Sequence, residues 1–238
     1  MVELGLGLLS IGRPWGVRRE AAPSEDAALE LLREAVALGI RFFDTAPAYG
    51  ASEAILGRFL RSSKAHLYVA TKMGEWWDGK ASTVDHRYEA LKSSIDRSLE
   101  LLGRIDLLQV HKSTAGNLRS TDVARAIEYA RSQGIREFGA SVSDLEAAHA
   151  AADSGWCSYL QFPFSRANTA LAPVFPLARE RGLKIIVNRP LAMGALSGTA
   201  AEAFAFVRVQ KFSGVVLTGT KSTAHLRENH AAFYARPA

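Results

Sequence analysis

Residues 37–44 read ALGIRFFD, which is the end of an amphipathic segment, a glycine, and a short apolar run that closes on an aspartate. The same order recurs in LLGRIDLLQV (101–110), SQGIREFGAS (132–141) and RERGLKIIV (179–187). A glycine after the last helical turn adopts the left-handed conformation without steric cost and is typical of a helix end. The apolar run after each glycine has the length and side-chain content of a buried strand. The repeated unit is therefore a helix, a glycine and a strand.

Extended along the chain, the pattern predicts eight strands, at Gly5–Ile11, Arg41–Ala46, Leu67–Met73, Ile105–His111, Ile135–Val142, Tyr159–Phe164, Lys184–Pro190 and Gly214–Thr220. Helical periodicity is clearest at Ala27–Leu38, Ser52–Arg61, Arg87–Leu102, Asp122–Gln133 and Thr223–Phe233. No linker or composition shift interrupts the series. About eight strand-helix units predict an α/β fold, a (β/α)8 TIM barrel with parallel strands, as a single domain over residues 1–238. An open doubly wound sheet is the structural alternative.

Composition excludes several classes of protein. Hydrophobic residues make up 48% of the chain and charged residues 22%, which is enough for one sizeable core. The single cysteine, Cys157, rules out an intrachain disulfide and any Cys-based metal site, so we expect a cytoplasmic protein without a metal. No apolar run approaches the roughly 18–20 residues of a membrane span. The net charge is +5, and the basic residues are scattered along the chain, which suits a phosphate-bearing cofactor better than a nucleic acid.

Polar residues stand at the ends of three consecutive predicted strands. The second strand ends in Asp44, with Tyr49 in the loop after it; the third ends in Lys72 and the fourth in His111. The active site of such a barrel lies at the carboxyl ends of its strands. Neighbouring strands are only about 4.8 Å apart. Each residue alone has an ordinary explanation, as a turn cap, a packed aromatic, a solvated strand end or a satisfied histidine, but together they predict one site.

These four side chains are suited to proton transfer beside a carbonyl group. The pKa of a tyrosine hydroxyl is ordinarily near 10, and the ammonium group of Lys72 is expected to lower the pKa of Tyr49. Pairing with Asp44 would hold Lys72 protonated and offset the cost of burying its charge. His111 can form a hydrogen bond with the carbonyl oxygen or with the phenol.

The later part of the chain suggests a place for phosphate. The segment TGTKS (218–222) leads from the last predicted strand into the last predicted helix. Backbone amides at Gly219 and Thr220, together with the helix N-terminus, can receive a phosphate group. The early stretch GLGLLS fails as a dinucleotide fingerprint because Ser10 occupies the third glycine position. We therefore expect Gly5 and Gly7 to be packing glycines of the first strand.

Several stretches together resemble the aldo-keto reductase superfamily, from Gly5 to about Phe233. They are GIRFFDTAPAYGASEAILG (39–57), VATKMG (69–74), IDLLQVHKS (105–113), REFGASVSD (136–144), YLQFPFS (159–165), NRPLAMGALSG (188–198) and VVLTGTKSTAHLREN (215–229). The resemblance implies reduction of an aldehyde or ketone to an alcohol by NADPH, or the reverse, on a small-molecule substrate. From the scattered charge and the lack of a long apolar run we expect no nucleic-acid or membrane partner, and we expect a monomer or weak homo-oligomer.

The resemblance assigns roles to individual residues. Tyr49 would be the general acid, tuned by Lys72 and Asp44, and His111 would position the carbonyl. The cofactor residues it implies are Ser141 and Gln161 at the nicotinamide amide, Lys221 at the 2′-phosphate, and Glu228 and Asn229 at the adenine. The nicotinamide carries the hydride, and the protein supplies orientation and electrostatics.

The chain also departs from the family. Asn188 and Arg189 stand where many members have an aromatic residue and a serine, and Val142 replaces a frequent asparagine. Arg189 can bind pyrophosphate or a substrate carboxylate instead. The chain is short for the family, and between Ser197 and Phe212 there is little beyond one helix, so we expect an open site.

Trp15, Trp76 and Trp77 are expected in the loops after the first and third strands, as an aromatic wall for the substrate.

Two other functions remain open. A nucleotide-binding or regulatory barrel with little catalysis is an alternative to a reductase. An isomerase or lyase that uses Lys72 or His111 as a base is another.

Overall fold

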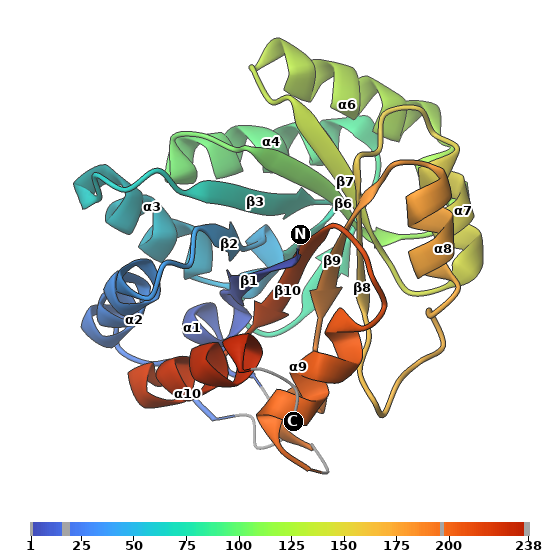
Figure 1. The fold of residues 1–238 in the computed structure, drawn as a ribbon. Helices are drawn as coiled ribbons and strands as arrows, with labels where there is room; N and C mark the ends of the chain where they lie inside the picture. The colour runs from blue at the N-terminus through green and yellow to red at the C-terminus, as the bar shows by residue number, and fades with distance from the viewer. Residues whose placement is uncertain (1, 16–19, 196–197, 236–238) are drawn as a thin grey trace.

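A computed structural model describes residues 2–15, 20–195 and 198–235, and in it eight parallel strands close into a barrel surrounded by helices (Figure 1). Around the barrel the order is β1, β10, β9, β8, β7, β6, β3 and β2, and β2 pairs back to β1. The strands are β1 (Val2–Gly7), β2 (Phe42–Asp44), β3 (Tyr68–Met73), β6 (Leu107–Ser113), β7 (Glu137–Val142), β8 (Tyr159–Pro163), β9 (Lys184–Asn188) and β10 (Gly214–Thr218). The predicted TIM barrel is confirmed, and the open sheet is wrong.

The helices cover the outer face of the barrel. They are α1 (Leu9–Gly12), α2 (Glu25–Ala37), α3 (Ser52–Ser62), α4 (Tyr88–Leu102), α5 (Ala115–Leu118), α6 (Thr121–Ser132), α7 (Leu145–Ala152), α8 (Val174–Glu180), α9 (Ala200–Arg208) and α10 (Thr223–Tyr234), with short 3-10 turns η1 (Pro47–Tyr49) and η2 (Ala192–Gly194). The glycines predicted to end helices have positive φ, for example 85° at Gly39 and 76° at Gly103. None of the helices in the described part of the chain is long and apolar enough to cross a membrane.

Two apolar layers hold the barrel together. The larger layer lies between the strands and the helices. The smaller layer fills the barrel interior and consists of Phe42, Ala70, Leu107, Tyr159, Ile186, Val215 and Leu217. Gly5 belongs to this interior, because a Cβ there would lie 2.6 Å from the Val215 side chain. Gly5 is therefore the packing glycine that the sequence predicted.

Some predicted boundaries were wrong. The first strand was expected at Gly5–Ile11, but β1 begins at Val2, where it pairs with Gly214, and the chain is already helical at Leu9–Gly12. A short apolar run reads alike as strand or helix, so its pattern could not separate the two. The fourth strand does not end at His111: β6 continues to Ser113, with a register shift after Val110.

Trp76 and Trp77 are not in an irregular loop. They belong to β4 (Glu75–Trp77), which forms an antiparallel hairpin with β5 (Ser82–Val84) beside the barrel. The Asp78 carboxylate accepts hydrogen bonds from the amides of Lys80 and Ala81 and so closes the turn. An Asp-Gly pair between strand-forming residues is a hairpin signal that could have predicted it. Leu196 and Ser197, at the end of the NRPLAMGALSG stretch, lie outside the described residues.

Candidate active site

The polar residues at the barrel mouth follow from the alternation of side chains along each strand. Phe42, Ala70 and Leu107 face the interior and pack against one another. Two residues further along the same strands come Asp44, Lys72 and Gln109, so these also face inward. They form a polar layer directly above the apolar interior, at the carboxyl ends of the strands.

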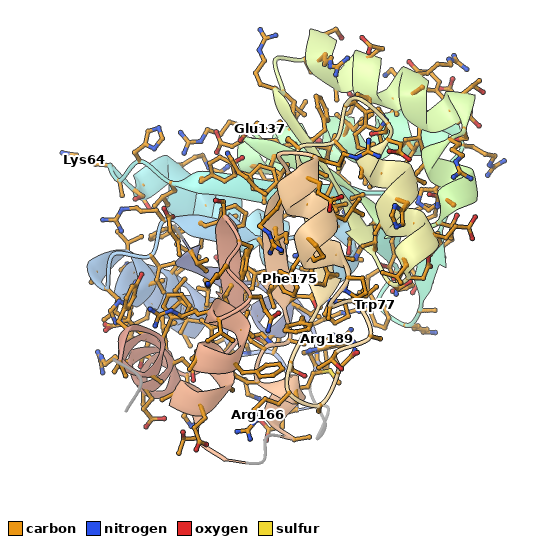
Figure 2. All side chains as sticks on the ribbon, turned by 45° about the vertical axis from the view of Figure 1, so that its right-hand side comes forward. Lys64, Trp77, Glu137, Arg166, Phe175 and Arg189 are labelled. Carbon is orange, nitrogen blue, oxygen red and sulfur yellow. The ribbon has the colours of Figure 1, made fainter. Side chains whose placement is uncertain are left out.

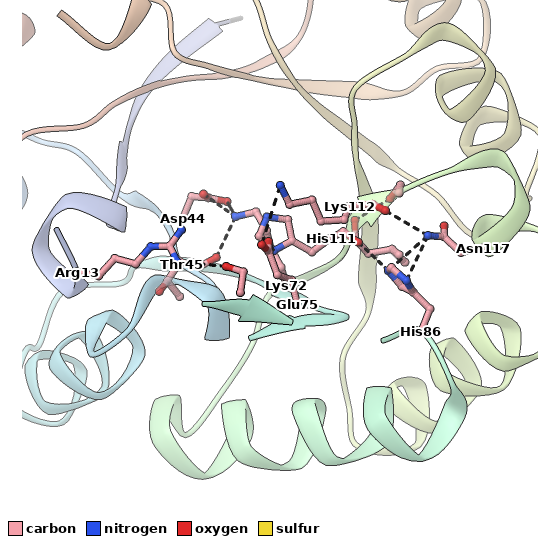
Figure 3. A network of polar contacts seen from close by, with 12 residues as sticks. Arg13, Asp44, Thr45, Lys72, Glu75, His86, His111, Lys112 and Asn117 are labelled. Atoms are coloured by element: carbon pink, nitrogen blue, oxygen red, sulfur yellow. Dashed lines mark hydrogen bonds and ion pairs between the residues drawn. The ribbon is translucent and has the colours of Figure 1, made fainter. Parts of the chain in front are cut away.

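Asp44 and Lys72 form a buried ion pair at the centre of this layer (Figure 3). The Lys72 ammonium donates to both carboxylate oxygens of Asp44 at 2.7 Å and to the Thr45 carbonyl at 2.9 Å. The Gln109 amide donates to Asp44 Oδ1 at 3.1 Å. Burial lowers the pKa of Lys72, but Asp44 and Tyr49 raise it by more, so its net pKa lies above the ordinary value. Lys72 is therefore a fixed positive charge, as the sequence predicted.

Tyr49 lies directly beside this charge. Lys72 Nζ is 4.8 Å from the centre of the Tyr49 ring, and the Tyr49 and His111 rings are 6.0 Å apart and nearly perpendicular. Burial raises the pKa of the Tyr49 hydroxyl, and Lys72 lowers it by less, so the net pKa lies above its ordinary value. The expected net lowering was wrong in sign, because it left out burial. The hydroxyl is therefore protonated at neutral pH and can donate a proton.

The turn that carries Tyr49 is held by polar contacts behind it. The hydroxyls of Thr45 and Ser52 lie 2.5 Å apart, both buried. The Ala51 amide donates to the Gly12 carbonyl at 3.0 Å, which ties the turn to the end of α1. These contacts fix the position of Tyr49 above Lys72.

Gly12→Ala is expected to displace the Tyr49 turn and to destabilise the protein by about 1–3 kcal/mol, as overpacking does. A Cβ at this position would lie 1.8 Å from the Tyr49 carbonyl oxygen and 2.6 Å from the Ser52 amide, both backbone atoms. Urea unfolding measures the loss of stability. Gly116→Ala is the matched control, because its Cβ would meet nothing closer than 3.9 Å. Equal stability of the two variants would contradict the tight contact.

His111 is held by two residues from outside its own strand. The register shift after Val110 takes it out of regular pairing with β7, and His86 Nε2 lies 2.7 Å from its carbonyl oxygen. On the ring side, Nδ1 is buried and lies 3.0 Å from Glu75 Oε2, as a close electrostatic contact rather than a linear hydrogen bond. Glu75 is itself buried, and its other oxygen lies 4.0 Å from Lys112 Nζ.

The Glu75 carboxylate decides which nitrogen of His111 carries the proton. Burial raises the pKa of Glu75, but His111 and Lys112 lower it by more, to about 2, so the group is ionised at neutral pH. Burial lowers the pKa of His111, so the ring is neutral there. A proton on Nδ1 avoids placing two lone pairs 3.0 Å apart. His111 Nε2 is then a hydrogen-bond acceptor, and it becomes a donor only when the ring is protonated.

Glu75→Gln is expected to destabilise the protein at pH 7 by about 1–3 kcal/mol, as the loss of a charged buried contact does. Because the folded pKa of Glu75, about 2, lies below the ordinary value of 4.5, its contribution is full above pH 4.5 and is lost as the pH falls through 2. Urea unfolding of wild type and variant between pH 7 and pH 2 measures this difference. A difference independent of pH would contradict the assignment.

The predicted nicotinamide residues lie on neighbouring strand ends. Ser141 of β7 aligns with Gln161 of β8, and Asn188 stands at the end of β9. The side-chain oxygens of Gln161 and Asn188 are both buried without a hydrogen-bond donor. Buried acceptors without a donor are rare and costly. A carboxamide donor such as that of nicotinamide would satisfy them, so these residues fit the cofactor that the sequence predicted.

The segment predicted to receive phosphate lies between β10 and α10. The loop over Gly219 and Thr220 leads into α10, whose N-cap Ser222 accepts from the His225 amide. A Cβ at Gly219 would have its nearest contact 3.7 Å away, so its backbone is open to a ligand. Lys221 forms an ion pair with Glu20 at 2.6 Å and donates to the Ala21 carbonyl at 3.1 Å.

Of the predicted adenine residues, one is engaged within the protein and one is not. Asn229 donates to the Thr218 hydroxyl at 2.9 Å, whereas Glu228 is exposed on α10. Of the two, Asn229 is tied to the end of β10 through Thr218. Their contact with adenine stays a prediction.

The predicted tryptophan wall forms only in part. Glu75 and Trp77 share one face of β4 by alternation, and Trp76 occupies the other face, exposed. Arg189 has a positive φ of 54°, and its guanidinium lies 5.7 Å from the centre of the Trp15 ring. In Figure 2 Trp77 and Arg189 are labelled close to each other in the lower half of the view, and Glu137, which starts β7, is labelled in the upper half.

Three polar residues of the mouth were not predicted from the sequence: Glu75, Gln109 and Arg13. Gln109 could have been found, because it precedes His111 by two residues and therefore faces the same side of the strand. Glu75 follows Lys72 by three residues, but its contact with His111 depends on the hairpin. Arg13 lies after α1, where no strand pattern signals its position.

Comparison with known proteins points to one family. The Aldo/keto reductase family model matches residues 3–212. The chain is 30% identical over 211 residues to L-galactose dehydrogenase of Arabidopsis thaliana, covering 82% of this chain and 63% of that protein. It is 28% identical over 216 residues to the NADH-specific methylglyoxal reductase of Escherichia coli, covering 83% and 66%. The chain thus spans less than two thirds of the length of these curated relatives.

A solved structure shows the same architecture over nearly the whole chain. It is that of PA4992 from Pseudomonas aeruginosa, a protein assigned to the aldo-keto reductases, with a TM-score of 0.84 and 29% identity, covering 97% of this chain and 88% of that one. Because the family match runs from residue 3 to residue 212, the chain belongs to the aldo/keto reductase family.

Proposed function

We propose that the protein is a nicotinamide-dependent oxidoreductase that reduces an aldehyde or ketone to an alcohol, or catalyses the reverse reaction. The buried Asp44–Lys72 pair beneath Tyr49, with His111 opposite, carries this proposal. Tyr49 donates its proton to the carbonyl oxygen, and Lys72 stabilises the phenolate that remains. Asp44 keeps Lys72 charged and in place.

The chain's own residues also suit the cofactor. Gln161 offers a buried acceptor for a carboxamide, Ser141 lies beside it, and the amides of Gly219 and Thr220 suit a phosphate. When bound, the dihydronicotinamide supplies the hydride. Neutral His111 presents Nε2 as an acceptor, which suits it to take a proton from an alcohol, and its protonated form can donate to a carbonyl oxygen.

A titration with NADPH and with NADH, followed by tryptophan fluorescence, tests this function first. Trp15 and Trp77 lie at the mouth and should report the bound cofactor. A panel of aldehydes and ketones then tests turnover. Binding without turnover of any carbonyl would favour the alternative of a nucleotide-binding or regulatory barrel, and absence of binding would remove the redox function altogether.

We further propose that the cofactor is NADPH, bound at its 2′-phosphate by Lys221. Since Glu20 pairs with Lys221 at 2.6 Å, the phosphate must replace this carboxylate. Lys221→Ala is expected to weaken NADPH binding roughly tenfold and NADH binding much less, and Glu20→Gln to strengthen NADPH binding, as a charge-assisted contact predicts. The E. coli relative is NADH-specific by name. Equal affinity of the wild type for NADPH and NADH would contradict the proposed preference.

A further inference from the structure

Arg13 holds a positive charge at the barrel mouth that no carboxylate of the described residues neutralises. Its guanidinium carbon lies 4.4 Å from the centre of the Trp77 ring and 5.8 Å from that of Trp15, and its NH1 donates to the Ser82 hydroxyl at 3.3 Å. Its Nε is buried without an acceptor. Among the described residues, no Asp or Glu oxygen lies within 4.0 Å of Arg13. A partly desolvated guanidinium with an unused donor calls for an anion.

Two backbone connections place Arg13 beside the reacting groups. Gly12, which precedes it, accepts the Ala51 amide just after the Tyr49 turn. A Cβ at Gly50 would lie 3.2 Å from the Cβ of Arg13, so the two segments are in close contact. On its other side, Arg13 stacks on Trp77, which shares a face of β4 with Glu75, the neighbour of His111. Arg13 therefore bridges the turn of Tyr49 and the strand that supports His111.

The acidic groups of the mouth are already engaged elsewhere. Asp44 is paired with Lys72, and Glu75 lies against His111 and Lys112. Arg189 adds a second guanidinium across Trp15, at the end of β9, where the orphaned oxygens of Gln161 and Asn188 lie. Arg13 is thus on the Tyr49 side of the mouth, and Arg189 is on the side of the proposed cofactor residues.

We propose that Arg13 binds a carboxylate carried by the carbonyl substrate, so that the substrates are oxo acids. A guanidinium stacked on an aromatic ring keeps its edge free for two parallel hydrogen bonds to a carboxylate. In this assignment the carboxylate lies on Arg13 and the carbonyl group at the other end of a short chain lies between Tyr49 and His111. This inference rests on the proposed oxidoreductase function and names the substrate class of the same site.

The kinetic test compares 4-oxobutanoate, its shorter and longer homologues, and the methyl ester of each. In the wild type, kcat/KM for the acid is expected to exceed that for the ester at least roughly tenfold, mainly through KM. In Arg13→Met the ratio falls to about one, and in Arg13→Lys it is intermediate, since lysine keeps the charge but not the planar pair of donors. Arg33→Met, at an exposed position on α2, keeps the wild-type ratio. A ratio near one in the wild type, or a ratio unchanged in Arg13→Met, overturns the proposal.

A binding test separates this proposal from the proposed function. Tryptophan fluorescence, without turnover, measures the affinity for 4-oxobutanoate and for its methyl ester. Tighter binding of the acid that is lost in Arg13→Met supports the carboxylate site even if no carbonyl is turned over. A loss of NADPH affinity in Arg13→Met, with the acid-to-ester ratio unchanged, would assign Arg13 to the cofactor pyrophosphate and overturn the substrate assignment.

Discussion

Replacement of Tyr49 by phenylalanine is expected to lower carbonyl reduction by about 10²–10⁴-fold, the usual contribution of a general acid, with cofactor affinity little changed. The ring keeps its place 4.8 Å from Lys72 Nζ and 6.0 Å from His111, so only the hydroxyl is lost. Steady-state kinetics and a fluorescence titration with NADPH measure the two effects separately. Turnover at the wild-type rate would show that the proton comes from another group.

The ionisation of Tyr49 gives an independent check on the same variant. Because burial raises its pKa above 10 despite Lys72, Tyr49 in the cofactor-free protein should be less than half ionised at pH 10. The absorbance difference between wild type and Tyr49→Phe, followed as a function of pH, isolates this single group. A phenolate that forms near pH 8 would mean that Lys72 outweighs burial.

The parts of the site that follow strand periodicity could be predicted from the sequence. Asp44 and Lys72 lie at inward positions of two neighbouring strands, and parallel pairing brings the ends of such strands together. Local pattern and sheet geometry were enough to place them, and they do form the central ion pair.

The features of the site that depend on burial, or on a segment that folds back beside the barrel, could not be predicted. The sign of the Tyr49 pKa shift depends on how completely the folded chain removes water from the hydroxyl, which no spacing records. Glu75 reaches His111 only because the β4–β5 hairpin folds beside the barrel. The end of the first strand was misplaced because Leu8 to Ile11 are apolar enough for either a strand or a helix.

Lys72→Met is expected to remove activity and to destabilise the protein by about 3–5 kcal/mol, because it leaves the buried Asp44 carboxylate without its counter-charge. Of the side chains that donate to Asp44 in the described structure, only Gln109, at 3.1 Å, would remain in this variant. Asp44→Asn is expected to destabilise less, since the Thr45 carbonyl still accepts from Lys72 and the buried amine can lose its proton once the carboxylate that holds it charged is gone. Urea unfolding and steady-state turnover measure both single variants.

The double variant Asp44→Asn with Lys72→Met separates stability from chemistry. The double variant has neither buried charge, so its loss in free energy of unfolding should be smaller than the sum of the two single losses by roughly 1–3 kcal/mol, as is found for coupled partners. Turnover should not recover, because nothing then stabilises the phenolate left on Tyr49. If the double variant were as active as wild type, the pair would only stabilise the fold. If the stability recovered but the activity did not, the buried charge of Lys72 would serve catalysis through Tyr49 and would not be needed for stability.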